Sequence, residues 1–162
     1  MKTFSRVLLI FVVLCVCVGC DQATKTLARQ HLVLAAPITL LGDTVRLHYT
    51  ENQGSFLGLG ARLPEGVRFW VFIVCAGLMV VLMFSFALTA RELNRLGVTG
   101  AALIIGGGFS NLLDRIIRNG RVADFMNIGI GNVRTGIFNV ADVVILIGIG
   151  LLLVSWPRRS TL

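Results

Sequence analysis

Four long apolar stretches dominate the chain, and the segments between them hold nearly all of its charge. Residues 69–90 and 96–113 carry no charged side chain, and residues 136–156 carry only Asp142. Residues 7–20 form a fourth, shorter stretch. Because a helix needs about 20 apolar residues to cross a bilayer, the pattern predicts four transmembrane helices. We expect them at about residues 5–24, 68–90, 96–115 and 137–156, with both termini on one side.

Two of the connections predict small β-structures. Residues 38–41 and 45–49 flank the turn dipeptide Gly42-Asp43, and residues 122–130 and 133–138 flank Gly131-Asn132. A two-stranded hairpin is too small to be stable alone. We therefore expect both hairpins to rest on the helices or the membrane surface, within extramembrane segments at about residues 36–67 and 119–136.

The composition supports a membrane protein. The 162 residues are 56% hydrophobic and only 14% charged, whereas soluble domains carry about 25% charged residues. We expect a single membrane domain covering residues 1–162. The net charge of +7 fits contact with anionic lipid. No basic stripe with interleaved aromatic residues occurs, so nucleic acid is not an expected partner.

The distribution of basic residues gives a weak orientation signal. More of them lie on the side opposite the termini, but there they are spread over long connections and mixed with carboxylates. Those on the side of the termini, such as Arg6, Arg91 and Arg95, lie in very short segments. The positive-inside rule gives short segments the greatest weight. We therefore expect cytoplasmic termini.

The N-terminus has features of a lipoprotein signal peptide. Lys2 and Arg6 precede an apolar run that ends in Cys17-Val18-Gly19-Cys20, and signal-peptide apolar regions have about this length. Cleavage at Cys20 is one reading. We favour a retained first span, because further spans follow instead of a soluble domain.

Four cysteines lie within apolar runs. Cys17 and Cys20 have the C-x-x-C spacing, with Cys15 and Cys75 as the others. Redox motifs of this spacing normally accompany a βαβ pattern, and a cysteine in an apolar run behaves as a small hydrophobe. We expect no metal, no cofactor and no disulfide.

Polar residues gather at one end of the predicted spans. Asn111, Asp114 and Arg115 share a helix face at the end of the third span, and Asn139 and Asp142 share one at the start of the fourth. The second hairpin places Asp124 on the same side of the bilayer, together with Asn52. Asp21 and Lys25 form a favourable i,i+4 pair just after the first span.

Asp124 and Asp142 are the candidate catalytic pair. Two neighbouring carboxylates cannot both ionise easily, so they share a proton. The ionised member can then take a proton from water while the neutral member polarises a carbonyl. Both histidines, His31 and His48, lie in the first connection, so no Ser/His pairing is available.

Other interpretations of these residues stay open at this point. Asp142 can be a simple helix cap, and Asp114 with Arg115 a pair at the water interface. A small ion-coupled transporter with Asp142 as proton relay is a second functional class. A structural or accessory membrane subunit is a third.

Several blocks in order resemble the lipoprotein signal peptidase (signal peptidase II) family of bacterial aspartyl peptidases. The matching residues are Asp21-Gln22 with Lys25, Asn52-x-Gly54, Gly108-x-x-Asn111-x-x-Asp114-Arg115, Val122-x-Asp124-Phe125 and Phe138-Asn139-x-Ala141-Asp142. The resemblance covers nearly the whole chain. It implies a four-helix membrane bundle with a small periplasmic β-cradle and a mobile short helix.

The same resemblance implies an activity and roles. The family removes the signal peptide from prolipoproteins, cutting just before a diacylglyceryl-modified cysteine. Asp124 and Asp142 would be the catalytic pair, with Asn52, Gly54, Asn111, Arg115 and Asn139 binding or shaping the site. Asp21, Lys25 and Asp114 would give structural support. We expect a monomer in the bacterial inner membrane, in contact with membrane lipid and with its active site at the periplasmic face.

Two positions depart from the family pattern. Ala123 stands where a branched residue is common, which we expect to alter packing only. Residues 55–57 read Ser-Phe-Leu where many members have Ala-Ala-Phe. The contact of this loop with substrate can therefore differ from that in the wider family.

Overall fold

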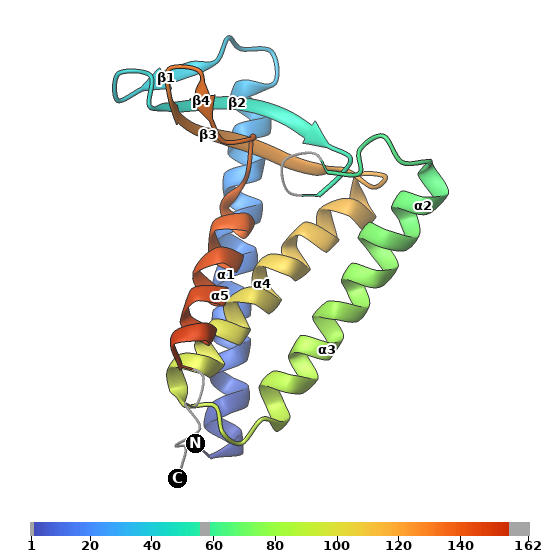
Figure 1. The fold of residues 1–162 in the computed structure, drawn as a ribbon, viewed down its shortest axis with the longest axis vertical. Coiled ribbons are helices and arrows are strands. Elements are labelled where there is room, and N and C mark those ends of the chain that lie inside the picture. The colour runs from blue at the N-terminus through green and yellow to red at the C-terminus, as the bar shows by residue number, and fades with distance from the viewer. Residues whose placement is uncertain (1, 56–58, 156–162) are drawn as a thin grey trace.

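The computed structural model describes residues 2–55 and 59–155. Helices α1 (Thr3–Leu32), α3 (Ala76–Thr89), α4 (Arg95–Ile117) and α5 (Val140–Ser155) form a bundle with a small sheet at one end (Figure 1). The short helix α2 (Glu65–Phe69) and a π-helical turn, η2 (Trp70–Cys75), lead directly into α3. The chain is therefore mostly helical with one antiparallel sheet, as expected.

Three helical segments of the described residues are long enough to span a membrane. Thr3–Leu32, Glu65–Thr89 and Arg95–Ile117 are long and apolar enough to cross a bilayer, and α5 is apolar but shorter. Large apolar side chains such as Phe11, Leu78 and Leu153 are exposed on the outside of the bundle. The expected end of the fourth span, residue 156, lies outside the described residues. The count of four spans and the single-domain boundaries stay predictions.

The sheet joins both predicted hairpins into one unit. Its strands are β1 (Ile38–Leu40), β2 (Val45–Asn52), β3 (Val122–Ile130) and β4 (Val133–Arg134), in the order β1-β2-β3-β4. The first hairpin is confirmed, and Gly42 and Asp43 turn it with positive φ angles. The pairing of β2 with β3 sets Thr50 opposite Asp124 and Asn52 opposite Val122.

The second hairpin is shorter than predicted. A strand over residues 133–138 is wrong, because β4 ends at Arg134 and only Phe138 makes a further isolated bridge, to Met126. The intervening Thr135 keeps one backbone bond to strand β3, from its N–H to the Ile128 carbonyl at 2.7 Å, and adds others. Its carbonyl accepts from the Asn127 amide at 2.5 Å, and its hydroxyl accepts from the Ile128 N–H at 3.0 Å.

Helix α4 lies at the centre of the bundle, and its small residues allow close packing. A Cβ on Gly100 would lie 2.7 Å from the Gly148 carbonyl oxygen of α5, and one on Gly107 would lie 2.6 Å from the Ala141 carbonyl oxygen. Only glycine fits at such backbone contacts. Small residues thus bring the backbones of α4 and α5 into direct contact.

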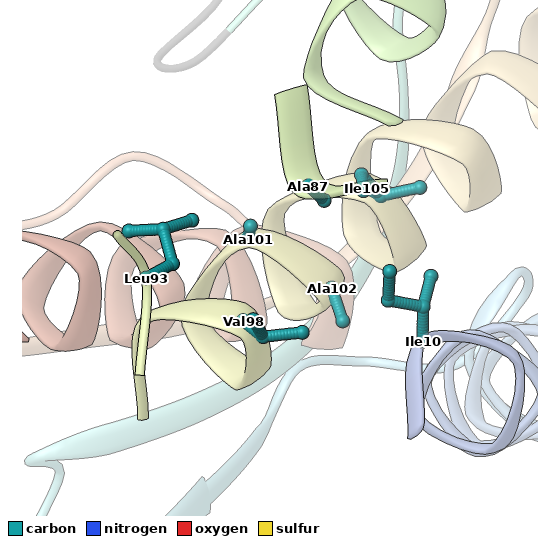
Figure 2. Close-up of a cluster of buried hydrophobic side chains, with 7 residues drawn as sticks. All are labelled: Ile10, Ala87, Leu93, Val98, Ala101, Ala102 and Ile105. Carbon is teal, nitrogen blue, oxygen red and sulfur yellow. The ribbon is translucent and has the colours of Figure 1, made fainter. Parts of the chain in front are cut away.

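The apolar core sits at the end of the bundle away from the sheet. Ile10, Ala87, Leu93, Val98, Ala101, Ala102 and Ile105 form this apolar cluster (Figure 2). Beside it, the buried Arg6 guanidinium donates to the carbonyl oxygens of Ala87 at 2.7 Å and Ala90 at 2.5 Å, at the C-terminal end of α3. Helix α1 also continues unbroken through Cys20. Retention of the N-terminal span stays a prediction.

Candidate active site

Helix α5 begins with a reciprocal cap that contains Asp142. The Asn139 side-chain oxygen accepts the Asp142 backbone N–H at 3.0 Å, and the Asp142 carboxylate accepts the Asn139 backbone N–H at 3.2 Å. This is the capping-box arrangement, in which each side chain satisfies a free N–H of the helix end. Asp142 is therefore a helix cap, as the simplest interpretation of the sequence suggested. Its second carboxylate oxygen is held by the Asn111 amide at 2.9 Å.

Asp124, on strand β3, bonds to the same asparagine, Asn139, that bonds Asp142. Its carboxylate oxygens accept the side-chain amides of Asn139 at 2.6 Å and Asn52 at 3.0 Å. Asn52 is available because β2 and β3 are paired, and its side-chain oxygen accepts the Gly54 N–H at 2.9 Å. The turn at Asn52 and Gly54 thus also orients an aspartate.

The two aspartates share one asparagine. Asn139 donates its amide to Asp124, and it bonds Asp142 through both its backbone N–H and its side-chain oxygen. Its amide also lies 3.2 Å from the Asn111 oxygen. Asn139 is fully buried, so these contacts fix the carboxylates relative to one another.

Burial changes the acidity of Asp124. It raises the pKa of Asp124 from 3.8 to about 6; the Asn52 and Asn139 hydrogen bonds oppose this, and the negative charge of Asp142 adds to it. A buried carboxylate that also faces a like charge holds its proton more tightly. Asp124 therefore exchanges its proton near neutral pH, which suits acid–base chemistry.

A buried ion cluster lies behind the aspartates. The Lys25 ammonium is fully buried and contacts Asp21 at 2.6 Å, Asp114 at 3.0 Å and the Asn111 side-chain oxygen at 2.8 Å. All three of its N–H donors thus have acceptors. Asp21 in turn accepts the Ala141 N–H at 2.9 Å, which anchors the start of α5 to α1. The predicted pair of Asp21 and Lys25 exists, but within the protein interior and not at a solvated helix end.

Arg115 ties the loop after β2 to α4. Its guanidinium donates to the Gly54 carbonyl at 2.9 Å and to the Asn111 carbonyl at 3.2 Å, and it lies over the Phe72 ring at 5.6 Å. The adjoining residues 56–57, whose contact with substrate is an open expectation, lie outside the described part of the chain.

The carboxylates open into a cavity of about 470 Å³. Asn52, Asn111, Asn139 and both aspartates form one part of its wall. Ser55 and Arg115 also line it, and most of the rest comes from apolar side chains of three helices, among them Met79 and Met83 of α3, Ile104 and Ile105 of α4, and Ile145 and Leu146 of α5. Such a volume, mostly apolar with a few convergent polar groups, is typical of ligand sites.

All ten predicted site residues are connected at this end of the bundle by the contacts given above. Two polar residues join them without having been predicted: the Ser110 hydroxyl donates to Asp21 at 2.7 Å, and the Gln22 amide donates to Asp114 at 3.1 Å. Ser110 lies one helical turn before Asp114, and this spacing is the signal that could have identified it as part of the site. His48 is exposed, as expected.

The described residues offer no evident set of side chains that could bind a metal ion. Among residues 2–55 and 59–155, no group of three or more His, Cys, Asp or Glu side chains is placed to hold a metal ion. Where Asp21 and Asp114 converge, the Lys25 ammonium occupies the space between them. All four cysteines are free thiols.

Comparison with known proteins identifies the family. The model described as "Signal peptidase (SPase) II" matches residues 13–157. The chain belongs to the signal peptidase II family. It is 32% identical to the lipoprotein signal peptidase of Halalkalibacterium halodurans, covering 91% of each chain, and 34% identical to that of Syntrophotalea carbinolica, covering 94% of this chain and 92% of the relative.

A solved structure has the same fold. It is described as "Bacterial membrane enzyme structure by the in meso method at 1.9 A resolution", and its TM-score is 0.77 over 93% of this chain and 94% of that one. At 19% identity the likeness is one of fold. Family membership together with the apolar helices makes the chain a membrane peptidase of prolipoprotein processing, and it does not favour the transporter.

Proposed function

We propose that the chain is an aspartic endopeptidase that hydrolyses the peptide bond before a diacylglyceryl-modified cysteine of a prolipoprotein. Asp124 and Asp142 are its catalytic pair. The observation that carries this proposal is their joint attachment to Asn139 on the wall of an otherwise apolar cavity. Peptide hydrolysis needs two acid–base groups, and lipid recognition needs an apolar wall.

The pair activates water by acid–base catalysis. Repulsion between adjacent carboxylates keeps one proton on the pair. Burial and the negative charge of Asp142 raise the pKa of Asp124 to about 6, so Asp124 carries that proton. The ionised Asp142 takes a proton from water, and Asp124 gives its proton to the carbonyl oxygen of the scissile bond. The water oxygen bonds to the carbonyl carbon and a tetrahedral diol results.

Collapse of the diol completes the reaction. The proton held by Asp142 moves to the leaving nitrogen as the carbon–nitrogen bond breaks, and Asp124 recovers a proton from the diol. The products are the signal peptide with a new carboxyl terminus and the lipidated cysteine with a free amine. The pair returns to its starting state with one proton, so no cofactor is consumed.

The surrounding polar residues keep the pair in place. Asn52, Asn111 and Asn139 fix the carboxylate oxygens, and Arg115 holds the Gly54 carbonyl near the cavity. Asp21, Lys25 and Asp114 support Asn111 and the start of α5 from behind. Pre-set geometry of this kind lowers the reorganisation needed in the transition state.

The apolar walls provide the lipid specificity. Helices α3, α4 and α5 each contribute to the cavity beside the aspartates, and burying acyl methylene groups there is favourable by about 0.8 kcal/mol each. We place the enzyme in the bacterial inner membrane as a monomer, with cytoplasmic termini and the aspartates at the periplasmic face.

Cleavage of a matched pair of substrates tests the proposal. A prolipoprotein peptide with a diacylglyceryl group on its cysteine should be cut by the detergent-solubilised chain at least ~100-fold faster than the same peptide with a free thiol. A peptide with serine in place of the cysteine is the control. Equal rates for the lipidated and free-thiol peptides would contradict entry of the lipid into the cavity.

A further inference from the structure

A second cavity, of about 340 Å³, lies between the C-terminal parts of α1 and α4 and the sheet. Its lining residues are Arg29, Glu51, Ile117, Arg118, Asn119 and Arg121. It shares no lining residue with the catalytic cavity. Three arginines against one glutamate leave a formal excess of two positive charges, so the cavity favours an anion.

The charges around this cavity are only partly neutralised. Arg121 contacts Glu51 at 2.8 Å, and Arg118 contacts Asp114 at 3.3 Å, although Asp114 is already paired with Lys25. The Arg121 hydrogen bond holds the pKa of Glu51 below its usual value, so Glu51 stays ionised. Among the ion pairs of the described residues, none includes Arg29.

Arg118 also has an unused donor. One terminal guanidinium nitrogen, Nη1, is buried and makes no hydrogen bond within the described ranges. Buried polar groups in native proteins almost always have a partner, and leaving one unpaired costs free energy. An anionic oxygen placed against this guanidinium would supply a further acceptor.

The position of the cavity indicates what carries that oxygen. The apolar helix α4 ends at Ile117, and Arg118 and Asn119 follow at once. Ile116 is 62% exposed and Ile117 is 67% exposed, and Ile117 also lines the cavity. Exposed aliphatic side chains directly beside arginines match a lipid, with acyl chains against the helix and a phosphate at the charged boundary.

We propose that this cavity binds the phosphate headgroup of an anionic membrane phospholipid, in the leaflet that faces the sheet end of the bundle. The guanidinium groups of Arg29, Arg118 and Arg121 hold the phosphate oxygens. Arginine suits this task because its planar donors match phosphate geometry. Arg118 also contacts Asp114, so the bound lipid would lie beside the ion cluster that supports the aspartates. The proposal does not depend on the cleavage reaction.

Thermal unfolding of the detergent-solubilised full chain tests lipid binding directly. Phosphatidylglycerol should raise the melting temperature in a saturable way, and phosphatidylcholine should not. Each arginine near a lipid surface contributes roughly a fivefold gain in affinity. The double variant Arg29→Gln with Arg121→Gln should therefore need about 25-fold more phosphatidylglycerol for half of the effect.

Arg62→Gln is the matched control, because Arg62 is an exposed arginine outside this cavity. It should titrate like the unmodified chain. Arg29→Gln alone, which removes no ion pair, should show about a fivefold loss and serves if the double variant does not fold. Three results would overturn the proposal: equal stabilisation by both lipids, an unchanged titration in the Arg29 variants, or the same stabilisation by inorganic phosphate without lipid.

Discussion

The two ends of the helix bundle are built on opposite principles. Away from the sheet, the apolar cluster around Ile10, Val98 and Ala102 is held by close packing (Figure 2). Next to the sheet, Asp21, Lys25 and Asp114 are at most 1% exposed. One end thus has an apolar cluster with a single buried arginine, Arg6, beside it, and the other concentrates buried charges.

The difference shows which end of the bundle needs its atoms held in fixed positions. Close backbone approach, as at Gly100 and Gly148, brings helices together without directional bonds. Buried charges lower the stability of the fold unless each one has its partners. When all the partners are present, their contacts fix the atoms to within hydrogen-bond distances. Lys25 has three acceptors for three donors. We infer that the apolar end gives the bundle its stability and the polar end gives the aspartates their geometry.

Removal of the central cation should have the largest effect on stability. Lys25→Met leaves Asp21 and Asp114 buried without their shared counter-ion, which should lower the free energy of unfolding by about 3–5 kcal/mol. Thermal unfolding in detergent measures this loss of stability. Adding Asp21→Asn and Asp114→Asn to Lys25→Met should recover much of that loss, because neutral groups need no counter-ion. Full stability of the single variant would mean that the ion cluster is dispensable.

A methyl group at the contact between Gly100 and Gly148 should destabilise the apolar end of the bundle by a smaller amount. In Gly100→Ala the new Cβ meets backbone atoms of α5, at 2.7 Å from the Gly148 oxygen and 2.9 Å from the Leu152 nitrogen. Separating two helices in this way should cost about 1–3 kcal/mol. The control is Gly150→Ala, where a Cβ meets nothing within 4 Å. It should be neutral or slightly stabilising, and equal losses in both variants would contradict the packing argument.

A change of pH should act on the polar end alone, because the apolar cluster has no titratable member. Burial raises the pKa of Asp124 to about 6, so a rise in pH above that value removes the proton that the pair shares. The cleavage rate should fall about tenfold per pH unit there. In partly exposed Asp43, the Arg46 hydrogen bond lowers the pKa, so Asp43→Asn should leave the profile unchanged. A flat rate between about pH 6 and pH 8 would exclude Asp124 as the carrier of that proton.

The local pattern was enough to predict much of the fold. Apolar runs located the helices, and turn dipeptides located both hairpins. The pairing of β2 with β3 could not be predicted, because alternation along a strand does not specify a partner about 70 residues away. That pairing brings Asn52 to Asp124. Thr135 shortened β4 through side-chain bonds that no periodicity records.

The site was predicted less from pattern than from resemblance. Spacing placed Asn111 with Asp114 and Asn139 with Asp142, since residues three apart share a helix face. It could not show that Asp21 caps α5 or that Lys25 reaches Asn111, because these contacts join helices distant in sequence. Ser110 and Gln22 went unrecognised for the same reason.

Single-turnover cleavage by Asp124→Asn, Asp142→Asn and the double variant tests the central claim most directly. If the aspartates act as one unit, each single change should reduce the rate at least ~10³-fold, and the double change should cost only a few-fold more. Asp43→Asn, which removes a partly exposed aspartate near the sheet, should cleave normally. Folded single variants that keep a tenth or more of the rate, or losses that multiply in the double variant, would contradict the account.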